Sequence, residues 1–154
     1  MDIKDALFLT HLRKNARETL TIISKRTNIP ISTLYDRLKA HEKTIITKHT
    51  TLINFTKIGY LCKANIAIKT DIKDRDTIKD FLMTQNAVNS LYKINNGYDF
   101  LIEGIFKHIK EMEDFVENIE RKFNIKEKNV HYIIEDLKRE GFLSEPELTK
   151  SGII

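Results

Sequence analysis

The sequence has little of the chemistry that marks secreted or membrane proteins. It contains one cysteine, Cys62, so no disulfide can form within the chain, which fits a reducing compartment. Its apolar runs are only a few residues long, too short for a membrane span. The opening stretch, MDIKDALF, carries two acids and lacks the basic and apolar regions of a secretion signal. We therefore expect a cytoplasmic protein with no membrane partner.

Motifs of metal binding and catalysis are equally scarce. The histidines are scattered, and no pair of Cys or His residues has the spacing of a zinc site. No glycine-rich phosphate loop and no nucleophile elbow is present. We expect no metal, no cofactor and no enzymatic activity. The scattered histidines are His11, His41, His49, His108 and His131.

The sequence does contain an uneven distribution of charge. The net charge is +4, but the first 60 residues hold 11 Lys or Arg against 5 Asp or Glu. The remaining 94 residues hold 15 Lys or Arg against 17 Asp or Glu, so all of the excess positive charge lies in the first 60. This asymmetry suggests a module that binds a polyanion, followed by a module with another role.

Two short helices are predicted at the N-terminus. Residues 4–15, KDALFLTHLRKN, place leucines at nearly helical spacing and end in basic residues that favour the C-terminal end of a helix dipole. Residues 19–28, TLTIISKRTN, form the second helix. Thr19 or Thr21 is available as its N-cap, and Asn28 is a suitable stop because asparagine tolerates the left-handed conformation.

A third helix is predicted in the stretch TNIPISTLYDRLKAHEK. Pro30 ends the preceding element, and Ser32 or Thr33 can cap the next. Residues 44–55, TIITKHTTLINF, are β-branched and alternating, as in a small hairpin. Three helices with a tight turn before the third, followed by a hairpin, predict a winged helix-turn-helix over residues 1–58.

The pattern changes to an alternation of strands and helices near Gly59. An Asn-Gly pair between two strand-like runs is a strong hairpin signal. The order strand, helix, strand, strand, helix, strand predicts a ferredoxin-like βαββαβ domain over residues 59–137 and an α+β protein overall. Residues 138–154 are expected to be a C-terminal arm. The predicted elements are strand 61–70, helix 74–83, strands 88–94 and 100–106, helix 108–123 and strand 129–135.

This order of elements resembles the leucine-responsive regulator/AsnC (Lrp/AsnC) family of bacterial and archaeal transcriptional regulators. The resemblance covers roughly residues 5–137 and is carried by LRKNARETLTIISKRTNIPISTLYDRLKAHE and INNGYDFLIEGIF. It implies a sequence-specific regulator that binds double-stranded DNA through its third helix. It also implies a second domain, the RAM domain, that forms homodimers or larger oligomers and responds to a small effector.

The sequence departs from the family pattern at three places. Pro30 precedes the recognition helix where the family commonly has serine, and His41 replaces a usual leucine. The turn where the family binds its effector, usually glycine, acidic, aromatic and aspartate, matches only in its last two positions. The residues implied to bind an amino-acid effector are Asn96, Gly97, Tyr98 and Asp99, although an Asn-Gly pair could simply form the hairpin and Asp99 could cap its own loop.

Contacts to DNA are expected from the third helix and from surrounding cations. Arg37 is the best candidate for a bidentate base contact, although it could instead pair with an acid such as Asp36 or Glu42, or with a phosphate. The residues expected to face bases are Ser32, Thr33, Tyr35, Arg37 and Lys39. Those expected to position phosphates are Arg17, Thr21, Lys25, Lys43 and Lys48.

Dimer formation is expected because two helices of the second domain can cover only one face of its sheet. The other face is predicted to retain Leu91, Leu101, Ile105 and Ile133 among polar residues, and an apolar sheet face needs a partner. A monomer whose tail covers that face is the alternative.

Two other functions remain open. One is an architectural protein that coats DNA without an effector. The other is an enzyme resembling the siroheme decarboxylases, for which His131 lies on a strand but no arginine-rich segment accompanies it.

Overall fold

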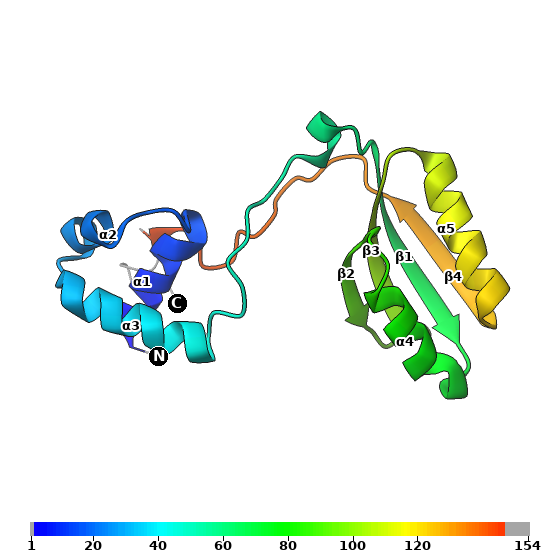
Figure 1. Cartoon of the computed structure of the whole chain (residues 1–154), viewed down its shortest axis with the longest axis horizontal. Helices are drawn as coiled ribbons and strands as arrows, with labels where there is room; N and C mark the ends of the chain where they lie inside the picture. The colour runs from blue at the N-terminus through cyan, green and yellow to red at the C-terminus, as the bar shows by residue number, and fades with distance from the viewer. Residues whose placement is uncertain (1, 147–154) are drawn as a thin grey trace. The chain divides into compact units, whose positions relative to one another are not determined.

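The computed structural model describes residues 2–146, which form two compact units (Figure 1). One, here called the helical unit, combines residues 2–52 with the C-terminal segment 137–146. The other, the sheet unit, comprises residues 53–136. The chain therefore passes between the units twice, and each unit has an apolar core of its own. The rest of the expected arm, residues 147–154, lies outside the described residues.

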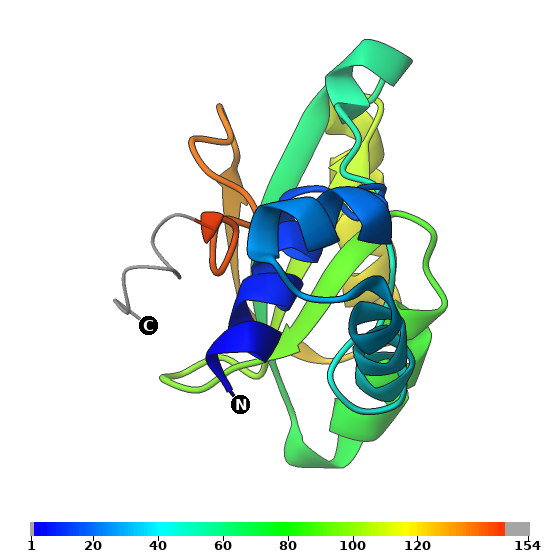
Figure 2. The same ribbon diagram turned by 90° about the vertical axis from the view of Figure 1, so that its left-hand side faces the viewer.

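Three helices make up most of the helical unit (Figure 2), and all three were predicted. They are α1 (Ile3–Lys14), α2 (Leu20–Thr27) and α3 (Ile31–Thr44). The side chain of Thr19 caps α2 at its N-terminus, and Asn28 ends it in the left-handed conformation at φ 57°.

The core of the helical unit is small. Phe8, Ile23, Ile29 and Leu34 are each at most 3% exposed and form one cluster, with one residue from each helix and Ile29 from the turn. A turn that inserts an apolar side chain into the core fixes the approach of α2 to α3. The sequence pattern had emphasised the leucines of α1, whereas Phe8 is its fully buried apolar residue.

The hairpin predicted over residues 44–55 is wrong. Residues 46–54 have no regular structure and lead into a short 3-10 helix, η1 (Phe55–Ile58), so the described chain has a helix-turn-helix without a β wing. The apolar side chains of this stretch, such as Leu52 at 52% exposed and Ile53 at 46%, pack into neither core. An isolated two-stranded hairpin is at best marginally stable, so alternation without a buried face does not form one.

The predicted cap of α3 is also wrong. Pro30 stands at the N-cap, no side chain caps the helix, and Ser32 and Thr33 lie within its first turn. Proline suits this position because its missing N–H leaves no backbone donor to satisfy. The two hydroxyl side chains are therefore not used as caps.

The sheet unit has the predicted ferredoxin-like order of elements. Its antiparallel sheet has the strand order β2-β3-β1-β4, and α4 and α5 cover one face (Figure 1). The fourth strand begins and ends earlier than the predicted range of 129–135. The elements are β1 (Cys62–Thr70), η2 (Ile72–Asp74), α4 (Arg75–Met83), β2 (Val88–Lys93), β3 (Phe100–Phe106), α5 (Ile109–Lys122) and β4 (Ile125–Tyr132).

Alternation along the strands builds the core of the sheet unit. In β1 the side chains of Cys62, Ala64, Ile66 and Ile68 are all buried beneath the helices, as the pattern predicted. Strand β3 continues this layer because Ile102 pairs with Ile66. Apolar side chains of α4 and α5 complete the core; they are Ile78, Leu82, Met112, Val116 and Ile119.

The opposite face of the sheet is not covered by α4 or α5, and we call it the open face. It carries Leu101 and Ile105 of β3, which pair with Ala67 and Lys63 on the outward positions of β1. Leu91 was predicted to lie here and does not. It pairs with Ile102 and packs against the core, so it belongs to the helix-covered face. The register of β2, which contains an irregularity at Val88–Ser90, decides this orientation.

The C-terminal segment of the helical unit packs against α1. The guanidinium of Arg13 donates hydrogen bonds to the carbonyl of Phe142 at 2.9 Å and to the carboxylate of Glu140 at 2.9 Å. Glu145 lies 3.8 Å from Lys14, one residue further along α1. Among residues 2–146, no helix has the length and apolar character that a membrane crossing requires.

Candidate nucleic-acid interface and effector region

The turn between α2 and α3 presents the first turn of α3 at the surface. Asn28 reverses the chain in the left-handed conformation, Ile29 is buried, and Pro30 starts the next helix. Because Leu34, Leu38 and His41 form the inner side of α3, the other residues between Leu34 and His41 lie on its outer side or flanks. This is the arrangement of a helix-turn-helix, whose second helix reads the major groove in DNA-binding proteins.

The predicted base-facing residues divide into three groups. Ser32, Tyr35 and Lys39 are exposed, and the ammonium of Lys39 lies 4.5 Å from the centre of the Tyr35 ring. Thr33 is half-buried on the flank of the helix. Arg37 is also half-buried, and unlike the others it forms ion pairs within the protein.

Arg37 is held by two carboxylates at the start of α1. Its guanidinium donates two hydrogen bonds of 3.1 Å to Asp2 and a further short one to Asp5. The hydrogen bond to Asp2 raises the pKa of Arg37 by favouring the charged guanidinium. A second side chain of α3, His41, lies 3.0 Å from Asp5 through its Nε2. These contacts tie α3 to the N-terminus of α1.

The expected acidic partners of Arg37 were therefore the wrong ones. Asp36 and Glu42 are its neighbours in sequence, but Asp36 is exposed and makes no ion pair with a described residue. Glu42 faces His49 at 3.3 Å. The signal available in the sequence was the acidic pair Asp2 and Asp5 at the beginning of the first helix, which can reach a basic residue on another helix only through the tertiary fold.

The Asp2 carboxylate gives the helical unit a specific dependence on pH. The hydrogen bond from Arg37 lowers the pKa of Asp2 from 3.8 to about 2. A folded-state pKa below the unfolded value means that the ionised group stabilises the fold above pH 3.8, and that this contribution is lost as the pH falls towards 2. We expect the Tm of the natural chain to exceed that of Asp2→Asn at pH 5, with the difference vanishing near pH 2.

Thermal unfolding followed by circular dichroism between pH 5 and pH 2 measures this difference. Asp36→Asn is the matched control, because it also removes one exposed carboxylate but none that binds Arg37. Parallel pH profiles for Asp2→Asn and Asp36→Asn would contradict the assignment.

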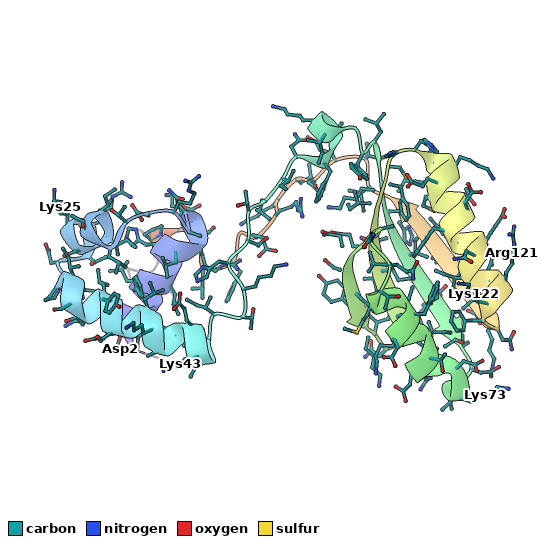
Figure 3. The ribbon with its side chains drawn as sticks, viewed as in Figure 1. Asp2, Lys25, Lys43, Lys73, Arg121 and Lys122 are labelled. Carbon is teal, nitrogen blue, oxygen red and sulfur yellow. The ribbon has the colours of Figure 1, made fainter. Side chains whose placement is uncertain are left out.

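The predicted phosphate-positioning residues are all exposed on the helical unit. Arg17 precedes α2, Thr21 and Lys25 lie on α2, and Lys43 lies in the last turn of α3. Lys48 is in the stretch without regular structure. Lys25 and Lys43 project from the surface (Figure 3), and none of the four cations makes an ion pair with a residue in the range 2–146. Their charge is therefore free to meet an external anion.

The predicted effector turn is a tight hairpin turn between β2 and β3. Asn96 and Gly97 have positive φ angles of 62° and 95°, as a two-residue hairpin turn requires, and Tyr98 is half-buried beside them. Asp99 is buried at 8% exposure. Its carboxylate accepts a hydrogen bond from the backbone N–H of Thr70 at 2.8 Å and lies 2.6 Å from the guanidinium of Arg75.

Asp99 is therefore committed within the protein. It caps the end of β1 rather than its own loop, and both of its carboxylate oxygens have partners. The Asn-Gly pair makes the hairpin, which was one of the two roles expected for it. The four residues Asn96 to Asp99 are adjacent, but the structure gives the Asp99 carboxylate no open side for a ligand ammonium group.

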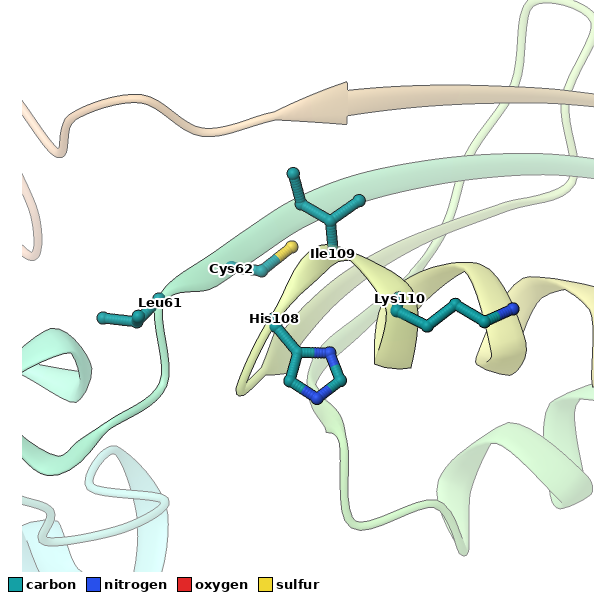
Figure 4. A pocket seen from close by; sticks show the side chains of 5 residues that line it. All are labelled: Leu61, Cys62, His108, Ile109 and Lys110. Atoms are coloured by element: carbon teal, nitrogen blue, oxygen red, sulfur yellow. The ribbon is translucent and has the colours of Figure 1, made fainter.

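A hollow at the other end of β1 contains the single cysteine (Figure 4). Its volume is about 460 Å³, and Leu61, Cys62, His108, Ile109 and Lys110 line it. Burial raises the pKa of the Cys62 thiol, so it is a poor nucleophile. His108 caps α5 by accepting a hydrogen bond from the Glu111 N–H at 3.1 Å. Within residues 2–146, no three His, Cys, Asp or Glu side chains are grouped as metal ligands.

Comparison with known proteins identifies relatives that extend over both units. Residues 63–142 match the family model described as the Lrp/AsnC ligand binding domain. An uncharacterized HTH-type transcriptional regulator of Pyrococcus horikoshii is 29% identical over 147 residues, which is 95% of this chain and 99% of that protein. An HTH-type transcriptional regulator of Pyrococcus abyssi is 27% identical over 120 residues, covering 77% and 80% of the two chains.

Solved structures share the fold. AsnC of E. coli has a TM-score of 0.82 and 18% identity, with 93% of this chain and 98% of that chain covered. A transcriptional regulator of Neisseria meningitidis in complex with L-Met has a TM-score of 0.83 and 19% identity, with 90% and 93% covered. Since the ligand-binding-domain model spans more than half of the sequence, this chain belongs to the Lrp/AsnC family of transcriptional regulators.

Proposed function

We propose that the protein is a sequence-specific DNA-binding regulator without catalytic activity, and that α3 is its recognition helix. The observation that carries the proposal is the outer side of α3, where Ser32, Tyr35 and Lys39 are exposed at a helix presented by a tight turn. Polar side chains on such a helix can read the hydrogen-bonding edges of bases in the major groove. The exposed cations around it supply the attraction to phosphates.

Arg37 has a second role in this proposal. Its ion pairs with Asp2 and Asp5 position α3 on α1, so a base contact by Arg37 requires the guanidinium to exchange carboxylates for DNA. A positioned helix is needed for sequence reading because base contacts depend on register. Arg37 thus contributes to recognition through the orientation of α3 even where it touches no base.

In the proposed function, the sheet unit pairs with a second copy of the chain to form a dimer, and it also binds an effector. Leu101 and Ile105 leave apolar surface on the open face, which suits pairing with a second copy. Two copies present two recognition helices, as needed for half-sites about one helical turn apart. A small effector such as an amino acid is supported by the ligand-binding-domain match and by the L-Met complex of the Neisseria regulator.

Selection of bound sequences from genomic fragments, followed by gel shifts against random competitor DNA, tests the proposal. We expect an enriched sequence with two related half-sites. If about six phosphates are neutralised per dimer, the logarithm of the affinity should fall with the logarithm of the salt concentration at a slope near −5. Equal affinity for all duplexes would favour an architectural DNA-coating protein instead, and absence of DNA binding would end both proposals.

Substitutions on α3 are expected to separate base contacts from phosphate contacts. Lys43→Ala should lower the affinity for the selected site and for scrambled DNA by the same factor, and reduce the salt slope of a dimer by about 2. Ser32→Ala should cost about 1–3 kcal/mol on the selected site and much less on scrambled DNA. Gel shifts over a salt series measure both effects, with Lys79→Ala in the sheet unit as the control. Identical responses of the two α3 variants on both DNAs would remove the assignment.

A further inference from the structure

A second hollow opens in the sheet unit where β1 ends and α4 begins. Its volume is about 480 Å³, within the range of small-molecule sites. The residues that matter for its chemistry are Lys69, Thr70, Asp71, Lys73, Arg75 and Lys126. Four of them are cations, three from residues 69–75 and one from β4, although residues 61–154 carry slightly more acids than bases.

The charges of this hollow are not fully balanced within the protein. Lys69 lies 3.0 Å from Glu127, and Lys126 contacts Asp71 at short range. Lys73 makes no ion pair with any residue in the described range, and it extends outward from the turn before α4 (Figure 3). Asp74, the next residue, does not line the hollow. One cation at the rim is therefore available to an external anion.

The guanidinium of Arg75, beside the hollow, is held by Asp99 of the predicted effector turn. One amino group of its guanidinium lies 2.6 Å from Asp99, and the Asp99 carboxylate is fixed in turn by the Thr70 N–H. The Nε atom of Arg75 is buried and has no acceptor among residues 2–146, whereas the side chain as a whole is 39% exposed. A guanidinium has five N–H donors, so a positioned Arg75 retains donors for a ligand.

We propose that this hollow is a binding site for the oxyanion group, carboxylate or phosphate, of a small effector. Arg75 binds the oxyanion through its planar guanidinium, and Lys73 closes over it as a mobile positive charge. The inference rests on the proposed function, since it names where an effector binds and which chemical group is recognised. A volume of about 480 Å³ suits a small molecule rather than the extended backbone of a nucleic acid. Arg75 is paired with Asp99, the last residue of the turn at residues 96–99. Binding of an oxyanion to Arg75 is therefore expected to alter the contacts of that turn.

NMR titration of the full-length chain with sodium phosphate or sodium acetate tests the site, with sodium chloride at equal ionic strength as the reference. We expect saturable chemical shift changes confined to the amides of residues 69–75, 99 and 126. Whichever of phosphate and acetate binds more tightly identifies the class of oxyanion. Arg75→Gln should weaken binding roughly tenfold or more, because it removes charge-assisted hydrogen bonds. Lys73→Gln should weaken it severalfold and keeps the fold intact, since Lys73 has no partner among the described residues.

Lys79→Gln, on α4 but outside the hollow, should leave binding unchanged. Chemical shift changes equal to those with chloride, or equal losses of binding affinity in Lys73→Gln and Lys79→Gln, would overturn the site.

A gel shift with and without the more strongly bound anion separates the proposed effector site from the proposed DNA-binding function. A change in DNA affinity that Lys73→Gln diminishes supports an effector site, and unchanged DNA affinity despite binding in the hollow overturns it. Failure to bind any DNA contradicts the proposed function, while the NMR result still decides whether the hollow binds oxyanions.

Discussion

A chain with Leu101→Asp and Ile105→Asp is expected to be monomeric and to bind its DNA site roughly 100-fold more weakly than the natural chain. Both side chains lie on outward positions of β3, on the sheet face that α4 and α5 leave uncovered. Two carboxylates per copy at a sheet-to-sheet interface are costly, because each must lose its bound water when the interface forms. Linking two binding modules raises the affinity by about 10²–10⁴, so loss of the dimer removes that gain.

Sedimentation gives the oligomeric state, and gel shifts on the selected site give the affinity. The matched control is Met83→Asp with Ile109→Asp, which adds the same charge at two apolar residues of the sheet unit that are 71% and 58% exposed. The control should remain dimeric. A natural chain that sediments as a monomer, or a control that dissociates as fully as the β3 variant, would show that the open face is not the interface.

Strands in which apolar and polar residues alternate were predictable from the sequence. Strands defined mainly by backbone hydrogen bonds to a neighbouring strand were not. In β1 every second residue from Cys62 to Ile68 is apolar and buried, so the pattern predicts both the strand and its inner face. Strand β4 begins Ile-Lys-Glu-Lys-Asn, with too few apolar residues to mark its start. Backbone pairing with β1 defines its actual extent, Ile125–Tyr132.

Register is the property that the sequence left undetermined. Leu91 sits in a strand of mixed composition, and a shift of one residue moves a side chain to the opposite face of a sheet. Only the pairing of Leu91 with Ile102 assigns it to the core. The predicted hairpin is wrong for a related reason. Residues 44–55 alternate in sequence, but neither core of the described chain includes their apolar side chains.

The candidate DNA-binding site was predictable in position but not in its internal contacts. The turn signals at Asn28 and Pro30 correctly located α3 and its exposed Ser32, Tyr35 and Lys39. The partners of Arg37 come from a helix about thirty residues earlier in the chain, beyond the reach of any local spacing rule. The same holds in part for the hollow at Arg75, where the pairing of β1 with β4 brings Lys126 beside the three cations of residues 69–75.

Replacing Phe8 by alanine is expected to unfold the helical unit and abolish DNA binding, while the sheet unit remains folded. Phe8 is fully buried in a core that has four buried members among the described residues, and its ring lies 6.3 Å from that of His41 on α3. Removing a buried Phe side chain costs about 3–5 kcal/mol. Domains are stabilised by about 0.05–0.15 kcal/mol per residue, so a unit of about 60 residues has roughly 3–9 kcal/mol in total. The substitution thus removes most of its stability.

Survival of the sheet unit is expected because no residue of 2–52 or 137–146 contributes to its core. The cluster from Cys62 to Ile119 is formed within residues 53–136. In the Phe8→Ala chain, NMR amide signals of the sheet unit should remain dispersed while those of α1, α2 and α3 collapse to random-coil positions. Urea unfolding by circular dichroism should show only the sheet-unit transition. Ile3→Ala is the control on the same helix, because Ile3 is 74% exposed, and it should change stability by about 0.5 kcal/mol or less. If the amide signals of the sheet unit were lost together with those of α1, α2 and α3, the two units would fold as one. The core around Phe8 would then not be a separate support for the position of α3.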